Sequence, residues 1–295
     1  MNQQPLPLLQ SRPHGGLTVP PEVQDRLAID ATTIYNECDL WVDDLFDFSH
    51  PDLATISHQS SNCGTLVTVT MPVARVLVDA NRPPNDADNP DGSIKSLTSY
   101  GEPIYTTPPT PVERQQLLER YWQPFHTELD AAINTHARHT LLFLDCHNMA
   151  QHGPSAYHDP GAQRPLICIA NLGDARGEPK SRNPEVTCPG WLLRAAGELA
   201  EMLFADLPLL QPDAIPAPIV ALNKPFAGGY ILREKSRLLA QVSNRPIPAM
   251  MIEVNRGLFV GQQTARTAIA PPNLPRIAAI RARLCQWVLG VLELL

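Results

Sequence analysis

The chain has 295 residues, of which 43% are hydrophobic, and a formal net charge of −7 at pH 7. A chain of this length and composition can bury a large hydrophobic core. The acidic balance argues against nucleic acid or an anionic membrane surface as a partner, because phosphate binding depends on clustered Lys and Arg.

The start of the chain has no basic stretch followed by an apolar core, so it does not have the pattern of a secretory signal. No segment approaches the roughly 20 uninterrupted apolar residues of a membrane helix. The six cysteines are scattered without a CxxC pair, which is typical of a reduced cytoplasm rather than of a disulfide framework. We therefore expect a cytoplasmic protein.

Short runs rich in β-branched or apolar residues predict the strands. These runs are apolar throughout instead of alternating with polar residues, as a sheet that is covered on both faces requires. In chain order they are 65–70, 73–79, 140–145, 165–170, 218–222 and 248–254.

Helical patterns alternate with these strands. The first, over 111–137, begins with a capping box in which Pro111 is the first helical residue, and it has an apolar residue at every third or fourth position. Pro124 lies inside this pattern and is expected to kink or split the helix. Two further helices are predicted over 189–206 and from about 273 to the C-terminus.

Strands that alternate with helices predict one α/β domain over residues 1–295, with a mixed, mostly parallel sheet. A stretch at about 83–111 is crowded with Pro, Gly, Asp and Asn and predicts one long loop. In open α/β sheets ligands bind beyond the carboxyl ends of the strands. Polar residues that follow the strands are therefore the candidates for chemistry.

Such residues follow several of the predicted strands. They are Asp79-Ala80-Asn81-Arg82 after 73–79, Asp145-Cys146-His147-Asn148 after 140–145, and Glu253-Val254-Asn255-Arg256 after 248–252. His14, in the segment 11–16, adds an imidazole near the N-terminus. Taken singly, such groups are explained by hydrogen bonding or helix capping. Glu253 carries more weight, because a carboxylate in an apolar strand is costly unless it is paired or has a task.

The motifs together resemble the N-formylglutamate amidohydrolase family and, more distantly, the zinc carboxypeptidases and aspartoacylases. The segments that carry the resemblance are Pro13 to Gly16, Asp39 to Phe46, Arg75 to Pro83, Trp122 to His126, Asp145 to Met149, Asn171 to Gly173, Asn223 to Ile231, and Ile252-Glu253. Each motif is unspecific alone, but they occur in a consistent order over about residues 11–260. The resemblance implies a three-layer α/β sandwich of the phosphorylase/hydrolase or zinc-exopeptidase kind, and metal-dependent hydrolysis of an N-acyl amino acid.

The resemblance implies a metal site as well. A catalytic zinc has three protein ligands and one open position, and the residues carried over as ligands of zinc, or of another divalent metal, are His14, Asp39 and His147. Glu253 is implied as the group that takes a proton from water and delivers it to the leaving amine. The HxxE pattern of the carboxypeptidases is absent here, so Glu22 stays a rival to Asp39 as the carboxylate ligand.

Two neighbours of His147 have less specific interpretations. Asp145 either orients His147 or caps the turn that follows. A nucleophilic Cys146 with His147 as its base is disfavoured, because adjacent residues of a strand point to opposite faces.

Substrate binding is expected from arginines and from a glycine-containing loop. Arg82 is the expected clamp for a substrate α-carboxylate, since a planar guanidinium binds carboxylate through two parallel hydrogen bonds, and Asn81 is expected to assist it. Arg75 is either a second carboxylate site or an arginine that extends to the sheet edge. The remaining candidates are Asn223, Gly228, Gly229 and Arg233.

The resemblance therefore implies a zinc-dependent amidohydrolase that acts on a small-molecule N-acyl amino acid. The substrate it favours is N-formyl-L-glutamate, as in histidine breakdown. The alternative is a carboxylate-binding relative that keeps the sheet and Arg82 but has no metal and no activity. Departures from the family pattern at Ala80, at Asp43-Asp44 and around 83–111 bear on the substrate more than on the hydrolytic residues. We expect a monomer or a small homo-oligomer.

Overall fold

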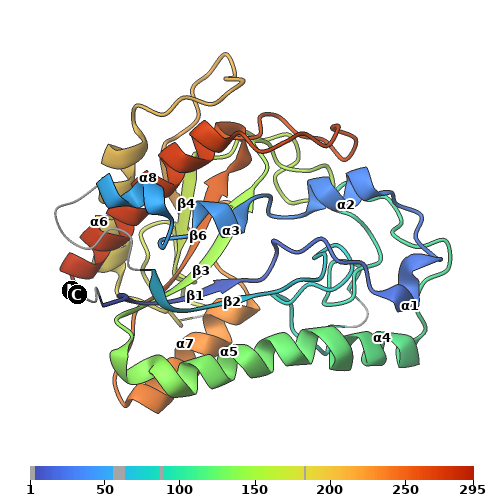
Figure 1. Ribbon diagram of the computed structural model, residues 1–295, viewed down its shortest axis with the longest axis horizontal. Helices are drawn as coiled ribbons and strands as arrows, with labels where there is room; N and C mark the ends of the chain where they lie inside the picture. Colours follow the sequence, from blue (N-terminus) through green and yellow to red (C-terminus); the bar gives the residue numbers. More distant parts are fainter. Residues whose placement is uncertain (1–3, 56–63, 87–88, 183) are drawn as a thin grey trace.

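The structure is a computed structural model that describes residues 4–55, 64–86, 89–182 and 184–295. Cys63 and positions 87–88 of the predicted loop lie outside the described residues. A central sheet runs through the molecule, with helices on both of its faces (Figure 1). This arrangement is the predicted three-layer α/β architecture.

The sheet has six strands in the order β2-β1-β3-β6-β4-β5. The strands are β1 (Leu6–Arg12), β2 (Thr65–Thr70), β3 (Leu142–Met149), β4 (Ile167–Ala170), β5 (Val220–Leu222) and β6 (Ala249–Asn255). Neighbouring strands are parallel except for β4 and β6, which are antiparallel. The prediction of a mixed, mostly parallel sheet is confirmed.

The helices form a layer on each side of this sheet. They are α1 (Pro21–Gln24), α2 (Ala31–Glu37), α3 (Val42–Leu45), α4 (Pro111–Leu117), α5 (Gln123–His136), α6 (Gly190–Phe204), α7 (Tyr230–Ser243) and α8 (Leu274–Glu293). α3, α6 and α8 cover one face, and α5 and α7 cover the other (Figure 1). Successive residues of β3 point to opposite faces of the sheet. Leu144 therefore packs in the hydrophobic cluster beneath α3, α6 and α8, and Phe143 packs in the cluster beneath α5 and α7.

The predicted helix over 111–137 is continuous but changes its hydrogen-bond pattern. It starts with the expected capping box of Thr110 and Glu113. A π-helical segment, Leu118–Trp122, joins α4 to α5 directly ahead of Pro124. Proline has no N–H to donate, so the helix adjusts its register at this point instead of breaking.

One predicted strand is wrong. Residues 73–79 form a turn in which Leu77 N and Val78 N donate to Ala74 O, and their one β-contact is an isolated bridge from Val73 to Thr18. The apolar side chains of this segment are buried in the cluster beneath α5 and α7. A buried loop and a buried strand have the same apolar composition, which is why the pattern did not separate them.

The sequence analysis missed strand β1, the short helices α1, α2 and α3, and helix α7. β1 has a proline and the buried polar residues Gln10, Ser11 and Arg12 within its run, which hide its strand character. α7 begins at Tyr230, so the predicted loop around 223–233 continues into a helix. Among the described residues, no helix is long and apolar enough to span a membrane.

Candidate metal centre

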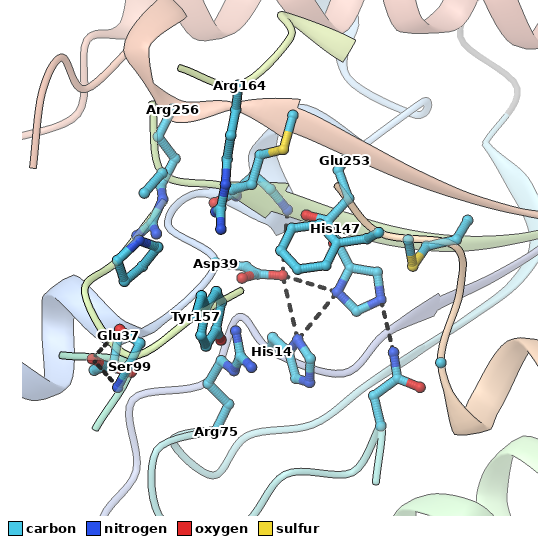
Figure 2. Close-up of a pocket in the computed structure, with 18 of the residues that line it drawn as sticks. His14, Glu37, Asp39, Arg75, Ser99, His147, Tyr157, Arg164, Glu253 and Arg256 are labelled. Atoms are coloured by element: carbon cyan, nitrogen blue, oxygen red, sulfur yellow. Dashed lines mark hydrogen bonds and ion pairs between the residues drawn. The ribbon is translucent and has the colours of Figure 1, made fainter. Parts of the chain in front are cut away.

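A pocket lies where β1, β3 and β6 approach their carboxyl ends. His14 follows β1 by two residues, His147 lies in β3, and Glu253 lies in β6 as the register partner of His147. The space inside it that atoms do not fill, open solvent included, is about 690 Å³. The side chains that line it converge on Asp39 (Figure 2).

His14, Asp39 and His147 form a tight group at the bottom of this pocket. The Nδ1 atoms of the two histidines are 3.1 Å apart. Asp39 Oδ2 lies 3.0 Å from His147 Nδ1 and 3.6 Å from His14 Nδ1. All three residues are buried, and one ligand atom from each lies within 4.8 Å of the other two. The structure thus brings together the three side chains that were predicted as metal ligands.

The outer nitrogen of each histidine has a carboxylate partner. His14 Nε2 lies 2.8 Å from Asp79 Oδ1, and His147 Nε2 lies 3.1 Å from Asp145 Oδ2. A carboxylate at Nε2 accepts the ring proton and leaves the lone pair on Nδ1, so two nitrogen lone pairs and one carboxylate oxygen face the same point. Electron pairs that converge in this way repel one another unless a cation or a proton lies between them.

The electrostatics of the group favour positive charge at this point. Burial alone would raise the pKa of Asp39, but His14 and His147 hold it below its usual range. Burial disfavours protonated His147, yet the carboxylates of Asp145 and Asp39 raise its pKa well above the ordinary value. Two imidazoles and one carboxylate are also the donor set of many catalytic zinc sites. The residues fit a divalent metal.

Basic side chains balance the buried Asp79. Lys95 Nζ and Arg75 Nη2 each lie 3.2 Å from Asp79 Oδ2. Burial would raise the pKa of Asp79, but His14, Lys95 and the nearby arginines hold it well below its usual value. Asp79 therefore stays ionised and keeps His14 in the orientation that turns Nδ1 toward Asp39.

Glu253 lines the same pocket and is 7% exposed. Among the described residues its carboxylate has no hydrogen-bond or ion-pair partner. Burial raises the pKa of Glu253 to about 7, and His147 opposes this shift. A carboxyl group with a pKa near neutrality can both accept and return a proton.

Arg82 and Asn81 line the pocket, and both already have protein partners. Arg82 donates from Nη2 to Asp91 Oδ2 at 2.8 Å and from Nε to Asp91 O at 3.0 Å. Asn81 Nδ2 lies 3.3 Å from His147 Nε2, and its Oδ1 accepts from Ile231 N. Asn81 thus ties the histidine to the start of α7, while the side chain of Arg82 is 29% exposed.

The other predicted substrate-binding residues divide into two groups. Arg75, Gly228 and Gly229 line the pocket, and a Cβ at Gly229 would lie 2.3 Å from the Oδ1 atom of Asn81. Asn223 and Arg233 are not among the lining residues. The amide of Asn223 donates to Asn171 and Asp174 within its own loop region, and Arg233 lies on α7 close to Glu185.

Glu22, the rival carboxylate ligand, is placed away from the histidines. It lies on α1, where its carboxylate binds Arg120 and Tyr121. The chain between α2 and α3 brings Asp39 to the site, and Asp39 N donates to His14 O at 3.0 Å. The structure therefore groups Asp39, and not Glu22, with the two histidines.

The sequence analysis missed the lining residues Tyr100, Tyr157 and Arg164, and it named Arg256 only as part of a polar run, without a role. Arg164 binds Asp159 through Nε and Nη2 and lies over the ring of Tyr157, 5.5 Å from its centroid. These residues come from segments without a recognisable motif. The one available signal was Arg256, which ends a polar run after a predicted strand.

The sequence profile of the N-formylglutamate amidohydrolase family matches residues 6–260. The chain belongs to this family. A curated relative, the N-formylglutamate deformylase of Pseudomonas putida, is 29% identical over 162 residues, which are 52% of this chain and 55% of the relative. The match thus spans about half the length of that family member.

Two solved structures share the fold of this chain. The N-formylglutamate amidohydrolase of Ralstonia eutropha JMP134 has a TM-score of 0.65 at 20% identity, with 99% of this chain and 94% of that chain covered. A gene product of Agrobacterium tumefaciens has a TM-score of 0.57 at 18% identity, with 97% and 90% covered. At these identities the likeness shows the α/β fold.

Proposed function

We propose that the protein is a metal-dependent amidohydrolase that cleaves N-formyl-L-glutamate, or a closely related N-acyl amino acid, at its amide bond. The observation that carries this proposal is the convergence of His14, Asp39 and His147 beside the unpaired carboxylate of Glu253 in one pocket. Membership of the N-formylglutamate amidohydrolase family supports the reaction class, and the name of the Pseudomonas putida relative supports the substrate.

The metal ligands would be His14, Asp39 and His147, with zinc as the first candidate. A divalent metal held there supplies a Lewis acid that activates water and polarises the acyl carbonyl. The contributions of the chain itself are orientation and proton transfer. Asp79 and Asp145 fix the two imidazoles through their Nε2 atoms, so the ligand atoms are in position before a metal arrives.

Glu253 is proposed as the residue that moves the proton. Its carboxylate accepts a proton from the attacking water as the oxygen adds to the formyl carbon. It then delivers that proton to the amide nitrogen as the C–N bond breaks, which releases formate and the free amino acid. The absence of a partner for this carboxylate among the described residues leaves it free to contact water and substrate.

Arginines supply the positive charge for an anionic substrate. We assign the α-carboxylate to Arg82, which lines the pocket together with Arg75 and has the more exposed side chain of these two. Binding there would replace or share the contact of Arg82 with Asp91. Arg75, which is paired with Asp79 and within reach of Asp39 electrostatically, would contact the substrate nearer the reacting carbonyl.

Metal content and formate release together test this function. We expect about one zinc or other divalent ion per purified chain, by the ligand set, and release of formate from N-formyl-L-glutamate that a chelator stops and zinc restores. Metal without formate release would mean that the substrate is another N-acyl amino acid. A protein without bound metal, whose hydrolysis a chelator does not change, would contradict the proposal and favour a metal-free carboxylate-binding protein.

A further inference from the structure

One buried arginine of the pocket lacks a carboxylate partner. Among the described residues, four arginines are buried, and three of them form ion pairs with a carboxylate. These pairs are Arg12–Asp43 at 3.2 Å, Arg164–Asp159 at 2.8 Å and Arg281–Asp52 at 2.9 Å. The fourth, Arg256, forms none within the part of the chain that the structure describes.

The hydrogen bonds of Arg256 leave part of its guanidinium unused. Nη1 donates to Asn36 O at 2.9 Å and to Cys38 O at 3.0 Å. Nε is buried and has no partner. Burial lowers the pKa of Arg256, and the nearby charges of Asp39 and Glu37 oppose this shift without forming an ion pair with it. A buried charge without a directly bonded counter-ion is destabilising, so this guanidinium has room for an anion supplied by the ligand.

The position of Arg256 suits an anion that is separate from the reacting amide. It follows Glu253 by three residues and lines the same pocket. In the view of Figure 2, Arg256 and Glu253 lie on opposite sides of Asp39. Glu37 is the acidic side chain on the side of Arg256, and its Oε1 accepts from Ser99 N at 3.0 Å and from Ser99 Oγ at 2.6 Å. Its bonds therefore go to Ser99 and not to Arg256.

Arg75 is the other pocket arginine with a buried, unpartnered Nε. It differs from Arg256 in one respect, because its Nη2 is paired with Asp79 Oδ2 at 3.2 Å. The charge of Arg75 is therefore compensated within the protein. Arg256 is the arginine whose charge a ligand would have to balance.

We propose that Arg256 binds the side-chain carboxylate of the substrate and so selects acidic N-acyl amino acids over neutral ones. This assignment rests on the proposed amidohydrolase function and names the residue that would determine its specificity. A planar guanidinium accommodates a carboxylate through parallel hydrogen bonds. The amide of a neutral analogue would leave the buried charge of Arg256 unbalanced, which disfavours that analogue.

The test compares two substrates and two variants. N-formyl-L-glutamine has nearly the shape of N-formyl-L-glutamate but carries no side-chain charge. For Arg256→Met we expect kcat/KM to fall by about 100-fold on the glutamate substrate and by far less on the glutamine substrate, as for truncation of one partner of a buried charge pair. The control is Arg281→Met, which also removes a buried arginine bonded to a backbone carbonyl. It should leave the ratio between the two substrates unchanged.

An equal loss on both substrates would overturn the proposal, because Arg256 would then act by holding the chain at Cys38 next to Asp39. If Arg256→Met does not fold, wild-type protein and Arg256→Lys decide the matter. A wild-type protein that does not distinguish the two substrates contradicts the proposal. A wild-type preference for the glutamate substrate that Arg256→Lys weakens supports it.

A binding measurement separates this inference from the hydrolytic function. Calorimetric titration of the metal-loaded protein with L-glutamate and with L-glutamine needs no turnover. Tighter binding of L-glutamate that is lost in Arg256→Met would support the carboxylate site even if no formyl compound is hydrolysed. Equal binding of the two amino acids by the wild-type protein would overturn the role of Arg256, whether or not formate is released.

Discussion

His14 and His147, which are 133 positions apart in the sequence, place their Nδ1 atoms 3.1 Å from each other. Each ring is held from behind by a buried carboxylate, Asp79 for His14 and Asp145 for His147. Two nitrogen lone pairs at this distance, beside the carboxylate of Asp39, are a preorganised arrangement whose repulsion a cation relieves. This repulsion therefore lowers the stability of the folded protein until a metal binds.

The first prediction concerns metal removal. Because a metal would bind the folded chain and not the unfolded one, we expect a chelator to lower the melting temperature of the purified protein. At a free metal concentration of 100 times Kd, the lost stabilisation would be about 2.7 kcal/mol. In His147→Ala the melting temperature should not respond to the chelator. His152→Ala, which removes a histidine bonded to Asp213 outside the metal group, is the control and should still respond.

The second prediction concerns Glu253. Replacement by glutamine keeps the size of the side chain but removes proton transfer, so Glu253→Gln should retain bound metal and lose about 10²–10⁴-fold in kcat. Metal analysis and formate release on the same preparation check both parts. Glu37→Gln alters another carboxylate of the pocket and should cause a smaller loss. Unchanged turnover in Glu253→Gln would show that another group carries the proton.

The metal-binding residues were predictable because each lies in a motif that resembles the N-formylglutamate amidohydrolase family, and His147 also follows a predicted strand. His147 and Glu253 lie on strands whose apolar runs were visible in the sequence, and their register across β3 and β6 brings them together. The strand that leads to His14 was not predicted, since a proline and the polar residues Gln10, Ser11 and Arg12 interrupt its apolar run.

The specificity residues could not be predicted in the same way, because their environment depends on contacts distant in sequence. Arg256 donates to carbonyl groups 218 and 220 positions away, and no local pattern indicates that these are carbonyls and not carboxylates. The local structure of the turn at 73–79 could not be predicted from its sequence pattern either. Its apolar run indicated burial correctly but did not indicate whether the buried chain is a strand.

The third prediction concerns Arg82. If it binds the α-carboxylate, Arg82→Ala should raise KM for N-formyl-L-glutamate by about 10- to 100-fold, the usual value of hydrogen bonds to a charged group, with a smaller change in kcat. The α-amide of the same substrate, which lacks that charge, should be affected much less. Asp91→Asn releases Arg82 from its ion pair and serves as the matched variant. Equal losses on the acid and the amide would refute this contact.

The fourth prediction concerns stability at acid pH and His126, a buried histidine outside the metal group. His126 Nε2 donates to Ala80 O at 2.9 Å, its ring stacks on Trp122, and its Nδ1 is buried without a partner. Burial lowers the pKa of His126 to about 3, with the charge of Lys235 acting in the same direction and the Ala80 carbonyl opposing it. The folded protein therefore keeps this imidazole neutral, whereas the unfolded chain protonates it at about pH 6.5.

The sign of the effect follows from the proton count. Between about pH 6.5 and 3 the unfolded chain binds a proton at His126 that the folded chain does not, so the free energy of unfolding falls as the pH falls. The slope of the unfolding free energy against pH that His126 causes approaches 1.4 kcal/mol per pH unit, the value for about one proton, and vanishes above pH 6.5.

Denaturant unfolding of chelator-treated protein from pH 7.5 to 4.5 measures this slope. His126→Gln keeps a donor for Ala80 O but cannot titrate, so its unfolding free energy should depend less steeply on pH by this amount. Parallel pH curves for the two proteins would mean that His126 is protonated in the folded state as readily as in the unfolded one.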